Sequence, residues 1–239
     1  MPHFPFQRLQ TDLSNLIAAT PAGQRLQSEP ALARKLGVSR ATLREAMRTF
    51  ETQGLIRRRQ GSGTYVVGKP PVIDSGLEVL ESLYTMARRM NLSISAGEIH
   101  VEKLAADDSQ AALFGLRPAS PLTRVRRVIR ATGRPVAYLI DTLPESVLAE
   151  RDLLNDFSGS VLDFLLARGD RLSASRAHVS AIGATSEVAK SLEIQRGDVL
   201  LHFDSHLFDA GGAAIDAALS YFIPGYFDFH IARRVSNTP

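Results

Sequence analysis

The sequence predicts two domains, a small helical one that ends in a β-hairpin and a larger α+β one with a mainly antiparallel sheet. Three observations lead to this prediction. Apolar residues recur at helical spacing in the first 53 residues and alternate along several later stretches. Residues 1–70 hold 11 Lys and Arg against 4 Asp and Glu, a net charge of +7, whereas the remainder carries −4. Paired prolines, Pro70 and Pro71, indicate a linker. We therefore expect domains at 1–69 and 75–235, joined by a linker at 70–74.

Composition narrows the class of protein further. The chain has 239 residues, of which 44% are hydrophobic and 22% charged, as in globular proteins. It has no cysteine, which excludes disulfides, thiolate metal sites and cysteine nucleophiles. No apolar run reaches the ~18 residues that span a bilayer, and the first residues lack a signal-peptide pattern. We expect a soluble, cytoplasmic protein.

The first domain is predicted to contain three helices. An apolar stripe over residues 9–17 indicates the first helix. Ser28 can cap a second, short helix that Gly37 ends in a left-handed conformation. Ser39 can cap a third helix, which runs to residue 53. A strand, a glycine-containing turn and a second strand follow over residues 55–67.

The third helix has two faces that point in different directions. The apolar face, predicted to pack onto the domain, consists of Leu43, Met47 and Phe50. The second face presents the three arginines Arg40, Arg44 and Arg48. One α-helix fits the major groove of DNA, where arginine reads base edges through two parallel hydrogen bonds. The arginines of the hairpin, Arg59 among them, suit a phosphate backbone or the minor groove. A solvated, arginine-rich helix with a basic hairpin is the alternative interpretation.

The same region resembles the winged helix–turn–helix of the GntR family of bacterial transcription regulators. The resemblance covers about residues 8–67. It rests on four short sequence motifs: Leu36-Gly37-Val38-Ser39-Arg40, Arg44-Glu45-Ala46, Gly54-Leu55-Ile56 and Gly61-Ser62-Gly63-Thr64. It implies that the start of the third helix and the tip of the hairpin contact operator DNA through Ser39, Arg40, Thr42, Arg44, Gln60 and Gly61. Pro30 stands where the family often has a DNA-contacting arginine, so that contact is lost.

Helices and strands alternate in the second domain. We expect helices at 75–90, 107–116, 158–168 and 185–193. We expect strands at 98–104, 122–130, 135–143, 172–182, 198–208, 213–223 and 226–234. This order predicts an α+β fold with a largely antiparallel sheet.

Residues 75–234 resemble the effector-binding domain of the HutC branch of the GntR family, the UTRA domain, whose sheet is related to the chorismate lyase fold. The matching words are Gly133-Arg134-Pro135-Val136-Ala137, Gly159-Ser160-Val161-Leu162, Gly197-Asp198-Val199-Leu200 and Ser220-Tyr221. The resemblance implies that a small effector binds at Arg127, Ser160, Asp216 and Tyr221. An arginine can bind a phosphate or carboxylate, and a helix start offers backbone donors to an anion. Purely structural roles for all four residues are the alternative.

Two further features have ordinary explanations. Sugar-phosphate-binding members often carry a second arginine where this chain has Ile129, which argues against a sugar phosphate as effector. His202, Asp204 and His206 alternate on one strand and could ligate a metal, but a polar strand face explains them as well. We predict no metal and no cofactor. The sequence also has no G-x-S-x-G, H-E-x-x-H or P-loop motif, so we do not expect an enzyme.

These inferences converge on a ligand-responsive DNA-binding transcription regulator, which we expect to be a homodimeric repressor with no membrane partner. One recognition helix covers only a short half-site of DNA. A two-fold operator is therefore expected to bind two copies of the chain as a dimer. Two alternatives remain at this point. One is a metabolite-converting enzyme with an appended DNA-binding domain. The other is a constitutive architectural DNA-binding protein without an effector.

Overall fold

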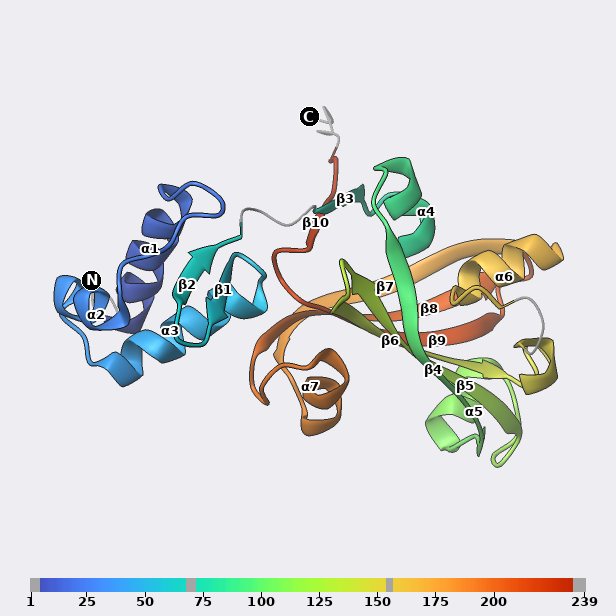
Figure 1. The fold of residues 1–239 in the computed structure, drawn as a ribbon. Coiled ribbons are helices and arrows are strands. Elements are labelled where there is room, and N and C mark those ends of the chain that lie inside the picture. Colours follow the sequence, from blue (N-terminus) through green and yellow to red (C-terminus); the bar gives the residue numbers. More distant parts are fainter. Residues whose placement is uncertain (1–4, 68–71, 154–156, 234–239) are drawn as a thin grey trace, which may run out of the picture. The chain divides into compact units, whose positions relative to one another are not determined.

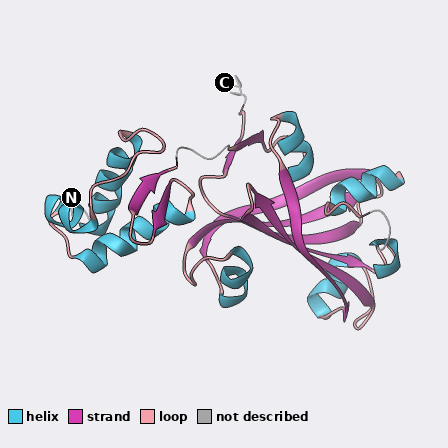
Figure 2. Cartoon of the chain, viewed as in Figure 1, coloured by secondary structure: helices cyan, strands magenta, loops and turns pink. Residues whose placement is uncertain are grey.

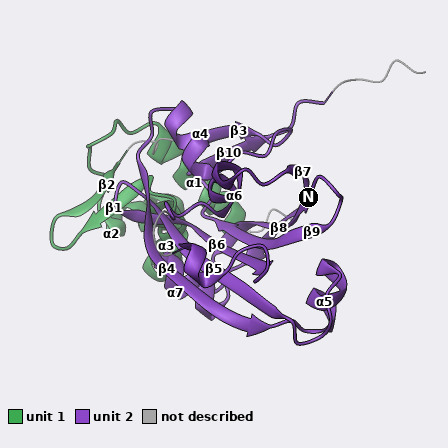
Figure 3. Ribbon diagram, turned by 90° about the vertical axis from the view of Figure 1, so that its right-hand side faces the viewer, with its two compact units in different colours: residues 1–72 green, residues 73–239 purple. Residues whose placement is uncertain are grey.

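The computed structural model describes residues 5–67, 72–153 and 157–233 of the chain (Figure 1). It divides into two compact units, residues 1–72 and residues 73–239 (Figure 3). The expected linker at 70–74 falls partly outside the described residues, and its last two residues, Ile73 and Asp74, already belong to a strand of the second unit.

Three helices and a hairpin form the first unit, and Figure 2 shows them by colour. The helices are α1 (Pro5–Ala18), α2 (Glu29–Leu36) and α3 (Arg40–Thr52). The strands β1 (Ile56–Arg59) and β2 (Gly63–Val66) pair antiparallel, and we call this hairpin the wing. The predicted apolar stripes make one buried core, in which Leu13, Leu43 and Met47 are fully enclosed. Apolar side chains at helical spacing therefore fix how α1 and α3 pack.

The turn between α2 and α3 depends on two local devices. Gly37 has a φ of +67°, the left-handed conformation that glycine adopts without strain, and ends α2. Ser39 caps α3, because its hydroxyl accepts a hydrogen bond from the Thr42 amide at 3.1 Å. Ser28 holds the corresponding place before α2, but its hydroxyl makes no capping hydrogen bond. In that helix Pro30 supports the first turn, where a missing N–H costs nothing.

A six-stranded antiparallel sheet dominates the second unit, with strand order β4-β5-β6-β9-β8-β7. Its strands are β4 (Ile94–Ala105), β5 (Pro121–Ala131), β6 (Arg134–Pro144), β7 (Leu172–Gly183), β8 (Val199–Asp209) and β9 (Ala214–Phe222). The helices between them are α4 (Leu83–Arg89), α5 (Asp108–Phe114), α6 (Val161–Arg168) and α7 (Ser186–Leu192), together with a short 3₁₀ helix at Glu150–Leu153. The predicted α+β class is confirmed.

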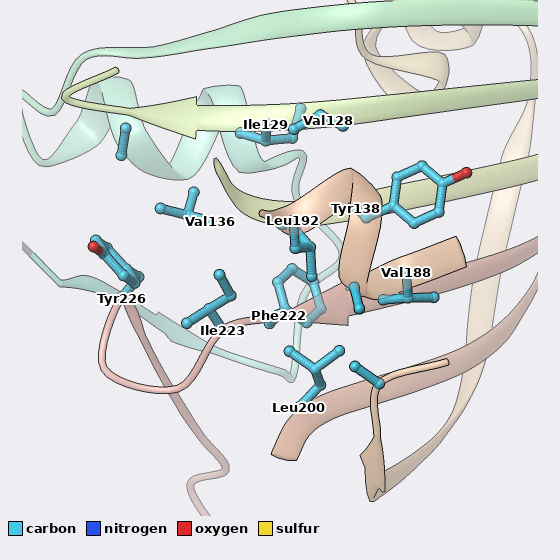
Figure 4. Close-up of a cluster of buried hydrophobic side chains, with 14 residues drawn as sticks. Val128, Ile129, Val136, Tyr138, Val188, Leu192, Leu200, Phe222, Ile223 and Tyr226 are labelled. Carbon is cyan, nitrogen blue, oxygen red and sulfur yellow. The ribbon is translucent and has the colours of Figure 1, made fainter. Parts of the chain in front are cut away.

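The two faces of this sheet have different neighbours. Figure 1 shows α6 on one face and α7 on the other. Val125 of β5 packs in a cluster with Val161 and Leu165 of α6. Figure 4 shows the cluster at α7, in which Val188 and Leu192 group with Tyr138 and Leu200 of the sheet. The helices α6 and α7 therefore belong to two different apolar clusters.

Two predicted elements need correction. The predicted helix over 75–90 is wrong in its first half, because Ile73–Gly76 form the strand β3, and the helix is only α4, capped by Ser82. The last strand, predicted at 226–234, is β10 (Phe227–His230), and it leaves the main sheet to pair in parallel with β3. The partner of β3 lies some 150 residues away, so no local pattern could reveal the pairing.

Candidate functional site

The predicted recognition helix presents part of its arginine stripe to solvent. The side chains of Leu43, Ala46 and Met47 are fully buried, and Arg40 and Arg44 lie exposed on the other side. Arg44 is 55% exposed, whereas Arg48 is 24% exposed and pairs with Glu45 at 2.7 Å. Each four-residue step advances about 40° beyond a full helical turn, so Arg48 is rotated by about 80° from Arg40. The stripe of three predicted arginines therefore turns partly away from the face of Arg40.

Arginines from three separate segments line one hollow of about 490 Å³ in the first unit. It lies between the start of α2, the start of α3 and the wing, and we call it the arginine hollow. Of the predicted DNA-contacting residues it contains Arg40, Arg44, Arg59, Gln60 and Gly61. The structure thus brings the recognition helix and the tip of the wing to the same depression.

The remaining predicted residues lie at or beyond the edge of this surface. Ser39 and Thr42 form the exposed first turn of α3, where their hydroxyls are 2.8 Å apart. Two further arginines line the hollow, Arg25 and Arg58. Arg58 is one of the hairpin arginines that the sequence assigned to DNA as a group, whereas Arg25 was not predicted. Nothing in the local sequence distinguishes Arg25, which reaches the hollow through tertiary structure.

Internal contacts hold several of these arginines in place. The Arg44 guanidinium pairs with the Glu29 carboxylate at 2.6 Å. Arg58 donates to the backbone carbonyl oxygen of Arg44 at 3.0 Å and pairs with Glu51 at 3.5 Å. Arg59 lies over the ring of Tyr65, 5.1 Å from its centroid. Planar, oriented guanidinium groups are suited to bidentate contacts with bases or phosphates.

The second unit contains a cluster of buried charges on the α6 face of its sheet. Arg127 of β5 pairs with Asp141 of β6, with Nη2 and Oδ2 2.7 Å apart, and both residues are buried. Asp216 of β9 lies beside this pair. Burial raises the pKa of Asp216 well above its usual value, and the neighbouring Asp141 carboxylate raises it further, while Arg127 opposes the shift. A proton bound at Asp216 is thus stabilised by its surroundings.

Ser160 lies at the margin of this cluster, at the start of α6. Its hydroxyl accepts from the Asp163 amide at 3.1 Å, and the Asp163 carboxylate in turn accepts from Ser82 at 2.6 Å. Tyr84 of α4 packs against the preceding Gly159 so closely that any side chain there would collide with its hydroxyl. Burial raises the pKa of Tyr84, and the charge of Arg127 lowers it. Tyr84 therefore contacts the residue before Ser160 and lies close enough to Arg127 to be affected by its charge. No sequence pattern pointed to Tyr84 or to Asp141.

Unpaired polar atoms concentrate in this cluster. Among the buried side-chain atoms of the described residues that have no hydrogen-bond partner, most belong to this cluster, on Arg127 (Nε and Nη1), Tyr84, Thr123, Asp141 and Asp216; the others are on Arg48, Arg58 and His202. An unmade hydrogen bond on a buried group costs ~1–3 kcal/mol. Such a set, with donors and acceptors close together, is suited to bind a small polar molecule.

Tyr221, the fourth predicted effector residue, lies apart from the other three. The register places Tyr221 opposite Tyr138 and His202, on the α7 face of the sheet, whereas Asp216 faces α6. Its ring stacks on Tyr138 at 6.1 Å and meets His202 at 4.8 Å. The structure therefore brings Arg127 and Asp216 together, with Ser160 at the start of the helix that packs on the same face, whereas Tyr221 lies on the opposite face.

His202, Asp204 and His206 also lie on that second face. Among the residues that the structure describes, no group of three His, Cys, Asp or Glu side chains has a geometry for holding a metal ion. Burial lowers the pKa of His202, with a smaller opposing effect from Asp204. His202 approaches Ser180 at 3.4 Å across the strands. These contacts fit a polar strand face.

Comparison with protein families accounts for both units. The model of the UTRA domain matches residues 89–228, and the model described as "Bacterial regulatory proteins, gntR family" matches residues 6–66. The chain belongs to the gntR family. Its C-terminal unit is a UTRA domain, a ligand-binding effector domain, and this GntR regulator is therefore a ligand-responsive, DNA-binding regulator of transcription.

Relatives of this GntR regulator are named as repressors. The "HTH-type transcriptional repressor NagR" of Bacillus subtilis is 27% identical, over 88% of this chain and 86% of its own. The "Histidine utilization repressor" of Pseudomonas putida is 29% identical, over 76% of this chain and 72% of its own. These comparisons give no support to the enzyme alternative.

A solved structure shares the fold of this GntR regulator. The crystal structure of PhnF from Mycobacterium smegmatis has a TM-score of 0.66 and 20% sequence identity, covering 95% of this chain and all of that one. In the part of the chain that the structure describes, no helix has both the length and the apolarity to cross a bilayer.

Proposed function

We propose that this chain is a homodimeric repressor that leaves its operator when a small molecule binds the buried cluster around Arg127. The observation that carries the proposal is the convergence of arginines from α3 and the wing on one surface, in a chain whose other unit holds a separate buried polar cluster. Relatives named as repressors support the direction of regulation.

Operator contacts are proposed for Ser39, Arg40, Thr42, Arg44, Arg48, Arg59, Gln60 and Gly61. Arg40 and Arg44 are exposed on a helix, and a helix is the element that enters a major groove. There an arginine guanidinium can donate two parallel hydrogen bonds to a guanine. Ser39 and Thr42 lie at the positive end of that helix, where hydroxyl and amide groups bind phosphate. Arg48, less exposed and paired with Glu45, contributes at the margin through its charge.

The proposed effector is a small molecule with an acceptor group for Arg127 and a donor group for Asp216. Arg127 has two unpaired nitrogen atoms, and Asp216 has an unpaired oxygen atom. Ile129, which is fully buried on the same strand as Arg127, offers no second guanidinium, so we expect a single negative charge rather than a phosphate dianion. Tyr221 joins the proposal only as a residue that acts from the opposite face through β9.

A dimer follows from the size of the reading surface. One recognition helix covers a short half-site, and two-fold operators are read by two copies. We assign dimerisation to the second unit, because the first one presents its arginines to DNA.

Two measurements test the proposal on the full-length chain. Fluorescence anisotropy with a duplex from upstream of its own gene is expected to show salt-dependent binding, tighter than to a shuffled duplex. A melting screen of metabolites is expected to find a molecule that raises the melting temperature, since a ligand of the native state adds stability. That molecule must then weaken DNA binding. Equal affinity for both duplexes would contradict operator recognition, and a stabilising ligand without effect on DNA binding would contradict the regulatory part.

A further inference from the structure

Arg25 lies outside the three helices, in a segment that runs antiparallel beside the wing. The Leu26 amide donates to the carbonyl oxygen of Thr64 at 2.8 Å, and the Gly23 amide donates to that of Val66 at 2.8 Å. Between these two bonds Arg25 forms a bridge with Tyr65 of β2. The backbone of Arg25 is therefore fixed to the wing, although 30 residues separate it from the first residue of the hairpin.

The side chain of Arg25 is also held against the wing. A Cβ atom on Gly63 would collide with its guanidinium, so Arg25 crosses the wing at a residue that has no side chain. Gly63 has a φ of +112°, which also favours glycine there. From this position Arg25 lines the arginine hollow together with the tip of the wing.

The charges around the hollow are unbalanced. Five arginines line it, at positions 25, 40, 44, 58 and 59, against the single carboxylate of Glu29. Glu29 pairs with Arg44, and Arg58 pairs with Glu51. Within the described residues, Arg25 and Arg40 take part in no ion pair. Positive charge without an internal counter-charge attracts an anion to this place.

We propose that Arg25 binds a backbone phosphate of the operator at the arginine hollow. The inference rests on the proposed operator binding and adds a contact outside the recognition helix and the hairpin. Arg25 lines the hollow from the wing and Arg40 lines it from the start of α3. When α3 enters a groove of DNA, a phosphate of the adjacent backbone can therefore reach Arg25. A guanidinium binds phosphate through two parallel hydrogen bonds, and a contact to the backbone carries no base sequence.

The test measures affinity across a series of salt concentrations, with the full-length chain, the duplex from upstream of its gene, and a shuffled duplex. Arg25→Ala is expected to weaken binding to both duplexes by about tenfold and to lower the slope of log K against log salt by about one. Arg25→Lys is expected to keep the slope with a smaller loss of affinity, since it keeps the charge but not the fork. The control is Arg8→Ala, an equal charge change on the exposed side of α1, away from the hollow. It is expected to change affinity less than twofold.

Ethylation interference identifies the phosphate itself. With the wild-type chain, ethylation of one phosphate in each half-site is expected to block binding, and with Arg25→Ala that sensitivity is lost. Unchanged affinity and slope for Arg25→Ala, at an unchanged melting temperature, would overturn the inference while operator binding stands. If Arg8→Ala lost as much DNA affinity as Arg25→Ala, the change in net charge alone would explain the effect. That result would also overturn the inference. If the wild-type chain itself failed to distinguish the two duplexes, the proposed function would fall, and this inference with it.

Discussion

Arg44 forms an ion pair with Glu29, and the same guanidinium is proposed to contact a base of the operator. Its guanidinium is more than half exposed, and the backbone carbonyl of the same residue accepts from Arg58, which ties the helix to the wing. Glu29 leaves part of the Arg44 fork available while limiting the orientations of the side chain. Pre-oriented side chains lose less entropy on binding.

Arg44→Ala is therefore expected to weaken specific operator binding by ~1–3 kcal/mol, and to weaken binding to shuffled DNA less. Anisotropy titrations with both duplexes measure the difference. Arg48→Ala provides the matched control, because it removes the same group from the same helix where the side chain turns toward Glu45. A loss for Arg48→Ala as large as that for Arg44→Ala would show that charge, rather than geometry, decides the contact.

Asp216 makes stability depend on pH in a definite direction. Burial and Asp141 raise its pKa above the ordinary value of 3.8, so the folded chain holds this proton more tightly than the unfolded chain does. The free energy of unfolding then falls as pH rises from about 4 through the raised pKa. Below about pH 4, Asp216 is protonated in both the folded and the unfolded chain. It then adds no pH dependence to the free energy of unfolding.

Asp216→Asn removes this titration. We expect the stability of the variant relative to wild type to increase as pH rises from 4 to 8, as measured by urea unfolding at each pH. Other titrating groups cancel in the comparison when their surroundings are unchanged. Parallel stability curves for the two chains would contradict the raised pKa.

At the scale of elements, two serines with the same predicted role differ in the structure. Ser39 caps α3 through its bond from the Thr42 amide, whereas the Ser28 hydroxyl makes no such bond before α2. Ser39→Ala is expected to destabilise the chain by ~1 kcal/mol, the usual cost of a lost cap. Ser28→Ala is expected to cost only a few tenths. Urea unfolding of both variants compares them, and equal losses would refute the difference in capping.

Elements with local causes are the ones that the sequence predicts well. The helices of the first unit, the wing and the strands β4 to β9 all follow from periodicity, capping residues and turns. The strand β3 was missed because its partner β10 is remote, and residues 77–81 extended the apparent helix. Asp141, Tyr84 and Arg25 became candidates only once strand register, helix packing and the bridge to β2 were known. Tyr221 illustrates the same limit, since one residue along a strand changes the face of the sheet.

At the scale of the whole molecule, regulation is a free-energy coupling between two binding events. A ligand that favours the arrangement without DNA lowers DNA affinity by some factor, and DNA lowers ligand affinity by the same factor. We expect isothermal titration of the effector into the free chain, and into the chain saturated with operator duplex, to differ by that factor. This equality holds for any number of conformations, so unequal factors would show that the two titrations compare different species, for instance different oligomeric states.

The pairing of β3 with β10 affects the order in which the two units can be completed during synthesis. Everything that the helix–turn–helix and the wing need is synthesised within the first 66 residues. The strand β3, which opens the second unit, must wait for its partner at residues 227–230, which is synthesised after all six strands of the main sheet. A nascent or prematurely terminated product that stops before β10 thus contains every residue of the first unit but lacks the partner of β3 in the second. We expect such a fragment not to respond to the effector.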